Sequence, residues 1–307
     1  MDVGRITIGA PRVLLATCAN VPDGDGDEQE LVEACARQGV VAQWAVWDDP
    51  DVDWSIADLV VVRSTWDYVE ARQEFLRWAR GIDRLSNPAE VLAWSSDKVY
   101  LHRLAEQGVP VVPTTVVADA EALTVDDGTE LVVKPSVGAG SVGAGRFSSD
   151  RPDATILARA HAADLQAHGR TVLTQPYLER VDTGGETDII FIDGVFSHAV
   201  RKGAMLPGGT VNAVDGASGD ELFRPELIEP RTPDAVELRV AQSALEAVPG
   251  PQPLLYVRID LLPTDDGPVV NEVELVEPSL FLRSAPGSVD RLAEAIARRA
   301  RTGTDRG

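Results

Sequence analysis

Charged residues near the C-terminal end of the chain share the faces of two predicted strands. Arg258 and Asp260 lie two apart in the first strand, and Glu272 and Glu274 lie two apart in the second. Side chains two apart along a strand point to the same side. The short turn at 265–267 allows the two strands to pair. A suitable register would therefore bring three carboxylates and one guanidinium together.

Three carboxylates in a partly buried patch repel one another unless a cation neutralises them. Hard oxygen ligands favour Mg²⁺ or Mn²⁺, which often take phosphate oxygens as further ligands. Both predicted strands are otherwise rich in apolar residues. Because unpaired buried acids are rare, we predict that Asp260, Glu272 and Glu274 form a metal site. The alternative is a solvated outer face on which these acids pair with surface lysines.

A glycine-rich segment follows a predicted strand that ends in Lys134. Gly138, Gly140 and Gly143 formally match a dinucleotide fingerprint. That fingerprint must open a helix directly, whereas residues 145–150 read as another strand, and no Walker A lysine follows the glycines. What is left is a flexible hairpin whose backbone amides can approach phosphate oxygens beside the Lys134 ammonium. An ordinary mobile turn with an exposed lysine is the alternative.

A third candidate group leaves the C-terminal end of a predicted buried strand, the edge at which open α/β sheets bind ligands. Arg63 could form a fork with a substrate carboxylate, and Trp66 and Tyr68 would supply a rigid apolar wall. Alternatively, the two aromatic residues cover the core and Arg63 pairs with Asp67. The candidate substrate contacts of this segment are Arg63, Ser64, Thr65, Trp66, Asp67 and Tyr68.

The composition excludes several classes of function. The chain has 307 residues and a formal net charge of -21, so it repels nucleic acid and anionic lipid, whose binding needs a cationic surface. Two cysteines, Cys18 and Cys35, cannot cross-link a chain of this length, which favours a reducing compartment. No apolar stretch approaches the length of a membrane span. We expect a cytoplasmic protein with a small-molecule substrate and no nucleic-acid or membrane partner, and the sequence allows a homo-oligomer.

Residues 11 to about 92 are predicted to form an open parallel sheet covered by helices. Apolar runs at 13–16, 40–47 and 58–62 predict buried strands, and helical spacing occurs at 28–38 and 70–80.

Ser95 or Ser96 is predicted to cap a helix that runs through Gln107, and the pattern changes after Pro110. Asp193-Gly194 is a strong signal for a two-residue hairpin. The predicted strands are 114–117, 130–135, 171–175, 188–192, 195–200, 254–262 and 269–276, and the predicted helices are 152–168, 233–248 and one near the C-terminus. This order predicts antiparallel sheets with helices on one face.

Five short motifs occur in an order and spacing that resemble the ATP-grasp ligases. They are Ser96-Asp-Lys98, Val133-Lys-Pro135 with its glycine loop, Gln175-Pro-Tyr-Leu178, Arg258-x-Asp260 and Glu272-x-Glu274. The resemblance covers residues 96 to about 282. It implies an N-terminal open parallel α/β domain at 1–94, in the position of a pre-ATP-grasp domain. A two-lobed ATP-grasp domain would follow at 95–307, with a mobile lid lobe at about 113–175.

The resemblance also implies a role for each motif. ATP would lie between the two lobes, with Lys98 and Lys134 on its phosphates and Glu186 at the ribose. The glycine loop would cover the phosphates through Ser136, Gly138, Gly140, Ser141 and Gly143, and the hinge at Gln175, Tyr177 and Leu178 would meet adenine. Arg258 would face the γ-phosphate. Asp260, Glu272 and Glu274 would bind Mg²⁺ or Mn²⁺, although the family usually has asparagine where Glu274 stands.

The family mechanism implies that ATP phosphorylates a substrate carboxylate and that an amine attacks the acyl phosphate, with release of ADP. Lid closure would exclude the water that hydrolyses this intermediate. No protein nucleophile is needed, which agrees with the lack of a legible Ser–His–acid spacing. Arg258, Lys134 and Arg201 are the predicted catalytic residues. Lys202 and Glu277 are predicted substrate contacts, Glu277 through the substrate's ammonium group.

The segments 63–68 and 271–279 are most similar to the subgroup that contains the D-cycloserine-forming O-ureido-serine cyclo-ligase. This similarity implies the intramolecular ring closure of an activated amino acid. An intermolecular amino-acid or peptide ligase of the glutathione synthetase-like type is the alternative, and only that reaction needs a separate amine. Two further hypotheses are a nucleotide-binding regulatory module without catalysis and a nicotinamide-dependent oxidoreductase based on the Gly138 fingerprint.

Overall fold

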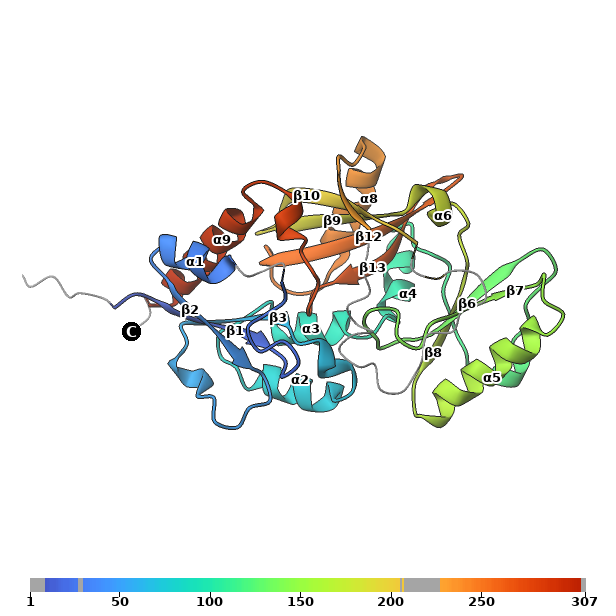
Figure 1. Ribbon diagram of the computed structural model, residues 1–307, viewed down its shortest axis with the longest axis horizontal. Coiled ribbons are helices and arrows are strands. Elements are labelled where there is room, and N and C mark those ends of the chain that lie inside the picture. The colour runs from blue at the N-terminus through green and yellow to red at the C-terminus, as the bar shows by residue number, and fades with distance from the viewer. Residues whose placement is uncertain (1–8, 27–29, 205, 207–226, 305–307) are drawn as a thin grey trace, which may run out of the picture.

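Three β-sheets follow one another along the chain and build an elongated molecule (Figure 1). The computed structural model describes residues 9–26, 30–204, 206 and 227–304. An N-terminal sheet and a central sheet lie next to each other, and a small sheet lies at the far end of the molecule. None of the described helices combines the length and the apolar character that crossing a lipid bilayer requires.

The N-terminal sheet is parallel, as the sequence predicts, and its strand order is β2-β1-β3-β4. Its strands are β1 (Arg12–Thr17), β2 (Val41–Val46), β3 (Leu59–Ser64) and the unpredicted two-residue β4 (Leu85–Ser86). Val13 and Leu15 pack toward α1 (Leu31–Arg37), whereas Leu14 and Ala16 pack toward α2 (Arg72–Arg80) and α3 (Ala89–Ser95). Because helices cover both faces, the central strands are apolar at nearly every position.

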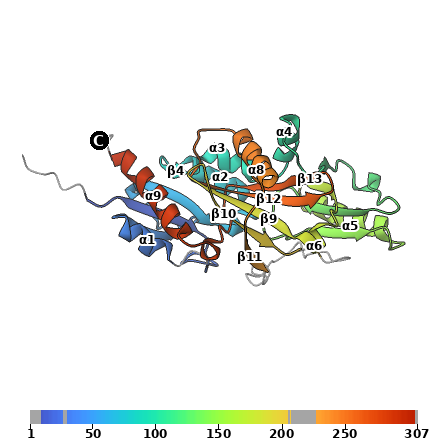
Figure 2. The same ribbon diagram turned by 90° about the horizontal axis from the view of Figure 1, so that it is seen from above.

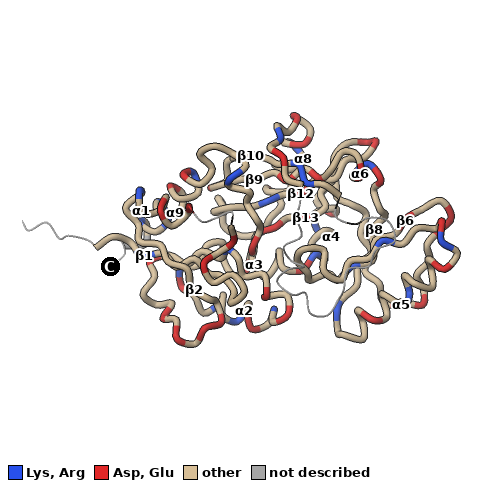
Figure 3. The backbone as a smooth tube through the Cα atoms, in the orientation of Figure 1, with Lys and Arg blue, Asp and Glu red and all other residues tan. Residues whose placement is uncertain are grey.

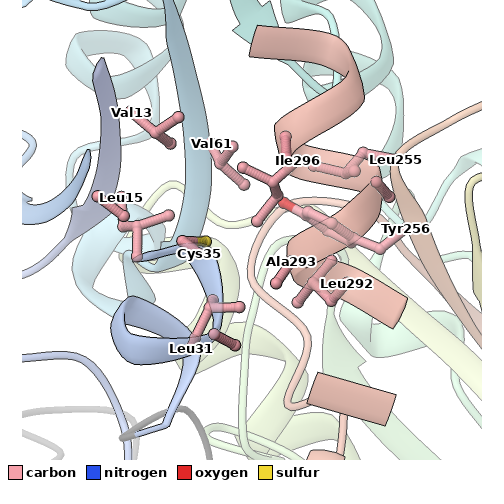
Figure 4. Packing of buried hydrophobic residues seen from close by; sticks show 14 of the residues in the cluster. Val13, Leu15, Leu31, Cys35, Val61, Leu255, Tyr256, Leu292, Ala293 and Ile296 are labelled. Carbon is pink, nitrogen blue, oxygen red and sulfur yellow. The ribbon is translucent and has the colours of Figure 1, made fainter. Parts of the chain in front are cut away.

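The C-terminal helix α9 (Ser288–Thr304) returns to this N-terminal sheet and completes its core (Figure 4). Leu292 and Ile296 of α9 belong to the same buried cluster as Leu15, Val61 and Tyr256. The two ends of the described chain therefore share one core. A division of the chain at residue 94 stays a prediction, and α9 would belong to the N-terminal unit by its packing.

The small sheet is antiparallel, with the order β5-β8-β6-β7. Its strands are β5 (Thr115–Val116), β6 (Glu130–Pro135), β7 (Gly145–Ser148) and β8 (Val172–Pro176). Helix α5 (Ala154–Ala167) covers one face and buries Ala158, Ala162 and Leu165 in a core of its own. This sheet and its helix occupy the residues that were predicted to form the lid lobe.

The central sheet is also antiparallel, and its order is β11-β10-β9-β12-β13. Its strands are β9 (Glu186–Ile192), β10 (Val195–Lys202), β11 (Ile228–Arg231), β12 (Tyr256–Thr264) and β13 (Gly267–Glu274). Asp193 and Gly194 both have positive φ, at 51° and 76°, which confirms the predicted two-residue hairpin. Seen from above, α3, α4 (Tyr100–Glu106) and α8 (Ala235–Ala247) lie on one side of this sheet (Figure 2).

The opposite face of the central sheet changes character along its strands. In β12, Tyr256 belongs to the core that α9 closes, while Arg258 and Asp260 follow on the same face. In β9, Ile190 belongs to that core and Asp188 lies opposite Asp260. One half of the face is therefore apolar and attached to the N-terminal sheet, and the other half carries charge.

The helix predicted from Ser95 or Ser96 to Gln107 is wrong in one respect. Ser95 ends α3, residues 96–99 form turns, and α4 begins at Tyr100. The Ser95 hydroxyl donates to Val273 O at 2.9 Å, and the Lys98 amide donates to Ser136 O at 2.8 Å. These contacts with β13 and with the end of β6 replace helical hydrogen bonds, and they fix Lys98 at the junction of the central and small sheets.

Asn87 joins the N-terminal sheet to the central sheet through a fully buried side chain. Its Nδ2 donates to Tyr256 O at 2.9 Å and Leu275 O at 3.3 Å, and its Oδ1 accepts from Leu255 N at 2.9 Å. The amide therefore satisfies three buried backbone groups that lie far from it in the sequence.

Replacing Asn87 by alanine should lower the free energy of unfolding by about 3 kcal/mol, because buried backbone groups would lose their partners. Urea denaturation followed by circular dichroism measures this difference. Asn20→Ala is the matched control, since Asn20 is exposed. Equal losses of stability in the two variants would contradict the bridging role of Asn87.

Candidate active site

A cavity of about 450 Å³ opens between the charged half of the central sheet, the small sheet and the loop after β13. All three lysines of the chain line it, while every other residue with a permanent positive charge is an arginine. Acidic residues, in contrast, are spread over the whole molecule (Figure 3). Most predicted site residues line this cavity: Trp66, Tyr68, Lys98, Lys134, Gly138, Gly140, Ser141, Gln175, Tyr177, Leu178, Glu186, Lys202, Arg258, Asp260, Glu272, Glu274 and Glu277.

The register of β12 and β13 brings the predicted metal ligands together. Asp260 lies opposite Glu272, and Arg258 lies opposite Glu274. Ligand oxygens of Asp260, Glu272 and Glu274 all lie within 4.8 Å of one another. Arg258 holds two of these acids, because its Nε is 2.8 Å from Asp260 Oδ1 and its Nη2 is 2.7 Å from Glu274 Oε1. These three carboxylates fit the hard oxygen ligands that Mg²⁺ or Mn²⁺ prefers.

Glu272 is shared by two lysines that come from different parts of the fold. Its Oε2 is 3.4 Å from Lys98 Nζ and its Oε1 is 3.3 Å from Lys134 Nζ. Burial favours the neutral form of each group, and the two ammonium groups outweigh that effect on Glu272, so the pKa of Glu272 lies below its usual value.

Burial also lowers the pKa of Lys134, and Glu272 offsets this effect only in part. The pKa of Lys98 is raised instead, because Glu274 and Glu277 act on Lys98 in addition to Glu272. Lys134 is consequently the lysine whose positive charge depends most on this one carboxylate.

Lys202 balances a second pair of acids on β9. Its Nζ is 3.0 Å from Glu186 Oε2 and 3.4 Å from Asp188 Oδ2. Asp188 is fully buried and neither of its oxygens has a hydrogen bond among the described residues. Burial and the charge of Asp260 raise the pKa of Asp188. Glu186, Asp188 and Asp260 form a second group of ligand oxygens within 4.8 Å of one another.

Asp188 is the charged residue of this site that sequence reasoning missed. Its two-residue spacing from Glu186 along a predicted strand would have placed both acids on one face. A second signal in the sequence is that lysine occurs at only three positions, which indicates that these lysines share one site.

The glycine loop lies directly against Lys98, whose Nζ donates to Gly138 O at 2.6 Å. Of the predicted loop residues, Ser136 and Gly143 lie outside the cavity lining and shape the loop instead. Ser136 is buried and binds backbone groups on both sides, and Gly143 has a φ of +73° that favours glycine. β7 follows the loop, so no helix begins where a dinucleotide fingerprint requires one.

The predicted hinge joins the small sheet to the central sheet. Gln175 Nε2 donates to Thr114 Oγ1 at 2.9 Å, which ties the end of β8 to the chain before β5. The Arg146 guanidinium lies 3.4 Å from the centre of the Tyr177 ring, and the Tyr177 hydroxyl donates to Asp182. Tyr177, which these contacts hold in place, therefore lines the cavity together with Leu178.

The segment after β3 divides its side chains between core and cavity. Trp66 and Tyr68 line the cavity, whereas Arg63, Ser64, Thr65 and Asp67 are not among the described residues that line it. Arg63 is buried, donates to Pro278 O at 2.9 Å and lies over the Tyr256 ring. Asp67 accepts a hydrogen bond from Trp47 Nε1. Arg63 thus holds the loop after β13 in place, and its predicted fork with a substrate carboxylate has no support in these contacts.

Arg201 also lies outside the cavity lining. Its Nε donates to Gly184 O at 2.6 Å and its Nη2 donates to Thr183 O at 2.8 Å. Successive side chains of a strand point to opposite faces, so only one of Arg201 and Lys202 can face the cavity. The structure places Lys202 there, and the predicted catalytic role of Arg201 has no support in its contacts.

The chain is similar over nearly its full length to proteins of cycloserine formation. A family model described as the N-terminal domain of D-cycloserine synthetase DcsG matches residues 13–87. The cycloserine biosynthesis protein DcsG of Streptomyces lavendulae is 41% identical over 295 residues, which span 90% of this chain and 94% of that protein. The crystal structure of D-cycloserine synthetase DcsG has a TM-score of 0.82 and 38% identity over 94% of this chain and 99% of that one.

A more distant likeness concerns the fold alone. The crystal structure of a RimK domain protein ATP-grasp from Sphaerobacter thermophilus has a TM-score of 0.64 at 19% identity. The match covers 94% of this chain and 98% of that one.

Replacing Glu272 by glutamine should increase the rate at which acetic anhydride acetylates Lys134 at neutral pH. The pKa of Lys134 would fall further without the carboxylate, so more of the amine would be neutral and reactive. Mass spectrometry of the Lys134 peptide measures the rate, with the N-terminal amine as an internal reference. Glu229→Gln is the control, because Glu229 pairs with Arg201 outside the cavity. A Lys134 rate that is unchanged in Glu272→Gln would contradict the shared ion pair.

Proposed function

The chain belongs to the family of ATP-grasp ligases that contains the cycloserine biosynthesis protein, and from this premise we propose that it closes a five-membered ring within O-ureido-D-serine. As a member of this family it is an ATP-dependent ligase that forms a C–N bond and releases ADP and phosphate. The match to the Streptomyces protein over 94% of that protein's length is the observation that carries the proposal. Ring closure leaves the α-carbon untouched, so a D-configured product requires a D-configured substrate.

The three lysines of the cavity supply positive charge for the phosphates of ATP. Lys98 and Lys134 would hold the transferred phosphate, with Arg258 facing it from the central sheet. Asp260, Glu272 and Glu274 would hold Mg²⁺, whose charge, once bound, stabilises the transferring phosphoryl group. The hinge wall of Tyr177 and Leu178 would meet the adenine ring.

The reaction then needs no nucleophile from the protein. A substrate carboxylate oxygen attacks the γ-phosphorus and ADP leaves, which forms an acyl phosphate. The nitrogen bonded to the side-chain oxygen attacks the acyl carbon, loses its proton and expels phosphate, which closes the ring. The ring nitrogen still carries the carbamoyl group at that stage. One water then attacks the carbamoyl carbon and the bond from that carbon to the ring nitrogen breaks, so the ring nitrogen takes a proton and the carbamoyl group leaves as carbamic acid, which decomposes to CO2 and ammonia. The residues of the cavity would hold both reacting groups of one substrate molecule in position, so much of the rate enhancement would come from their orientation.

Turnover with a single amino acid tests the proposal. O-ureido-D-serine with Mg²⁺ and ATP should give equal amounts of ADP and phosphate without any added amine, and chromatography should detect D-cycloserine. Added hydroxylamine should divert the acyl phosphate to a hydroxamate. ADP release that requires a second amino acid would indicate an intermolecular ligase instead. Formation of AMP would reject acyl-phosphate chemistry.

Lys134→Ala should weaken ATP binding roughly 10- to 100-fold, because one charge-assisted contact to phosphate would be lost. Isothermal titration calorimetry with a non-hydrolysable ATP analogue and Mg²⁺ measures the change. Arg151→Ala is the control, since Arg151 is an exposed cation of the small-sheet region that pairs with Asp153. If the two variants bind the analogue equally, Lys134 does not contact the nucleotide.

A further inference from the structure

The acids that line the cavity fall into two groups by their partners. Glu272, Asp260 and Glu186 each lie within ion-pair distance of a lysine or arginine. Glu277 differs from them. The partner of its carboxylate among the described residues is its own backbone amide, and no ion pair reaches it. Glu277 is nevertheless only partly exposed and lines the cavity.

Keeping a carboxylate charged in such a partly buried position costs free energy unless a cation binds to it. Burial and the neighbouring charge of Glu274 raise the pKa of Glu277 to about 8. Protein cations do not remove this cost, because Lys98 and Arg258 act on Glu277 only from a distance. A bound metal ion does not account for it either, because Glu277 belongs to neither of the two groups of carboxylates that come close enough to share a cation among the described residues.

The surroundings of Glu277 are fixed. Trp66 Nε1 donates to Glu277 O at 3.1 Å, and Arg63 donates to Pro278 O at 2.9 Å, so two side chains of the N-terminal sheet hold this backbone. Tyr68 is buried and lines the same cavity, and Glu277 is the charged group that acts most strongly on its hydroxyl. This wall of the cavity therefore combines a carboxylate on a firmly held backbone with the buried phenol of Tyr68.

This wall lies just beyond the predicted metal ligands, three residues after Glu274. If the reacting carboxylate of the substrate lies beside the metal ion and Arg258, the groups on the neighbouring α-carbon would lie near Glu277. We propose that Glu277, assisted by Tyr68, binds the ammonium group of the amino-acid substrate and thereby selects α-amino acids over carboxylic acids that lack this group. The inference rests on the proposed function for the position of the reacting carboxylate. Glu277 is accordingly a specificity-determining residue and takes no part in phosphoryl transfer.

The experiment compares two ligands in the full-length protein. O-ureido-D-serine carries the ammonium group, and 3-(ureidooxy)propanoate has the same chain without it. Binding is measured by the shift in unfolding midpoint and by calorimetry, in the presence of Mg²⁺ and a non-hydrolysable ATP analogue, so that no turnover is needed. The wild type should bind the first ligand roughly 10- to 100-fold more tightly than the second.

Glu277→Gln keeps the shape of the side chain but cannot take on the negative charge that a bound ammonium group would stabilise, so it should bind both ligands with similar affinity and keep the wild-type affinity for the ATP analogue. Glu70→Gln is the matched control, because Glu70 is an exposed acid two residues after Tyr68, and it should keep the full preference. Tyr68→Phe should reduce the preference in part.

Two results would overturn the role of Glu277 and leave ring closure intact: equal binding of both ligands by the wild type, or an undiminished preference in Glu277→Gln. Failure of O-ureido-D-serine to bind the wild type would overturn both the role and the proposed function. Binding of O-ureido-D-serine with the expected preference, together with no ADP release when ATP replaces the analogue in a separate turnover assay, would overturn the proposed function alone.

Discussion

The mutual neutralisation of buried charges on one half of a sheet face is the constraint on which this site depends. Glu272 lies between Lys98 and Lys134, Arg258 holds Asp260 and Glu274, and Lys202 holds Glu186 and Asp188. Each group alone would be expensive to remove from water, and together they offset much of that cost. The same arrangement presents cations for phosphate and carboxylates for a metal ion. A metal–nucleotide complex carries the complementary charges, so under the proposed function affinity for it and stability of the cavity would depend on the same side chains.

The central sheet can carry these charges because its face is divided. Its apolar half is attached to the N-terminal sheet through α9 and Tyr256, whose hydroxyl lies 2.5 Å from Val62 O and 3.0 Å from Val276 O. Asn87 adds a second polar connection between the two sheets. These buried contacts hold Trp66 and Tyr68 over the loop after β13. The side of the cavity that Trp66 and Tyr68 line is thus built from one firmly packed body, whereas the small sheet has its own core and meets the cavity through its hinge and glycine loop.

Local sequence patterns predicted strands and turns well where a single preference, such as the burial of apolar residues or a positive φ, determined the structure. Alternation and apolar runs predicted most strands of the three sheets to within a few residues but missed β4 and β11, and Asp193-Gly194 predicted the hairpin. The helix expected to run from Ser95 or Ser96 through Gln107 was interrupted because Ser95 and Lys98 bind backbone groups of β13 and β6, which no local pattern reveals. Arg201 and Lys202 were equivalent in the sequence, yet strand alternation allows only one to face the cavity. Arg63 looked like a ligand residue and instead holds a backbone carbonyl 215 residues away.

The sequence by itself determined which chemistry is available: a lysine beside a glycine loop, acids two apart in neighbouring strands, and motifs in an order that resembles one ligase family. Residue type and spacing along one strand or loop are local properties, so they can be read without coordinates. Only the tertiary structure decided which charges meet, because Lys98, Lys134 and Glu272 come from three separate segments. It also decided that Asp188 joins them and that Glu277 has no ion-pair partner among the residues that the structure describes. Those facts depend on register and on the packing of three sheets, which long-range contacts fix.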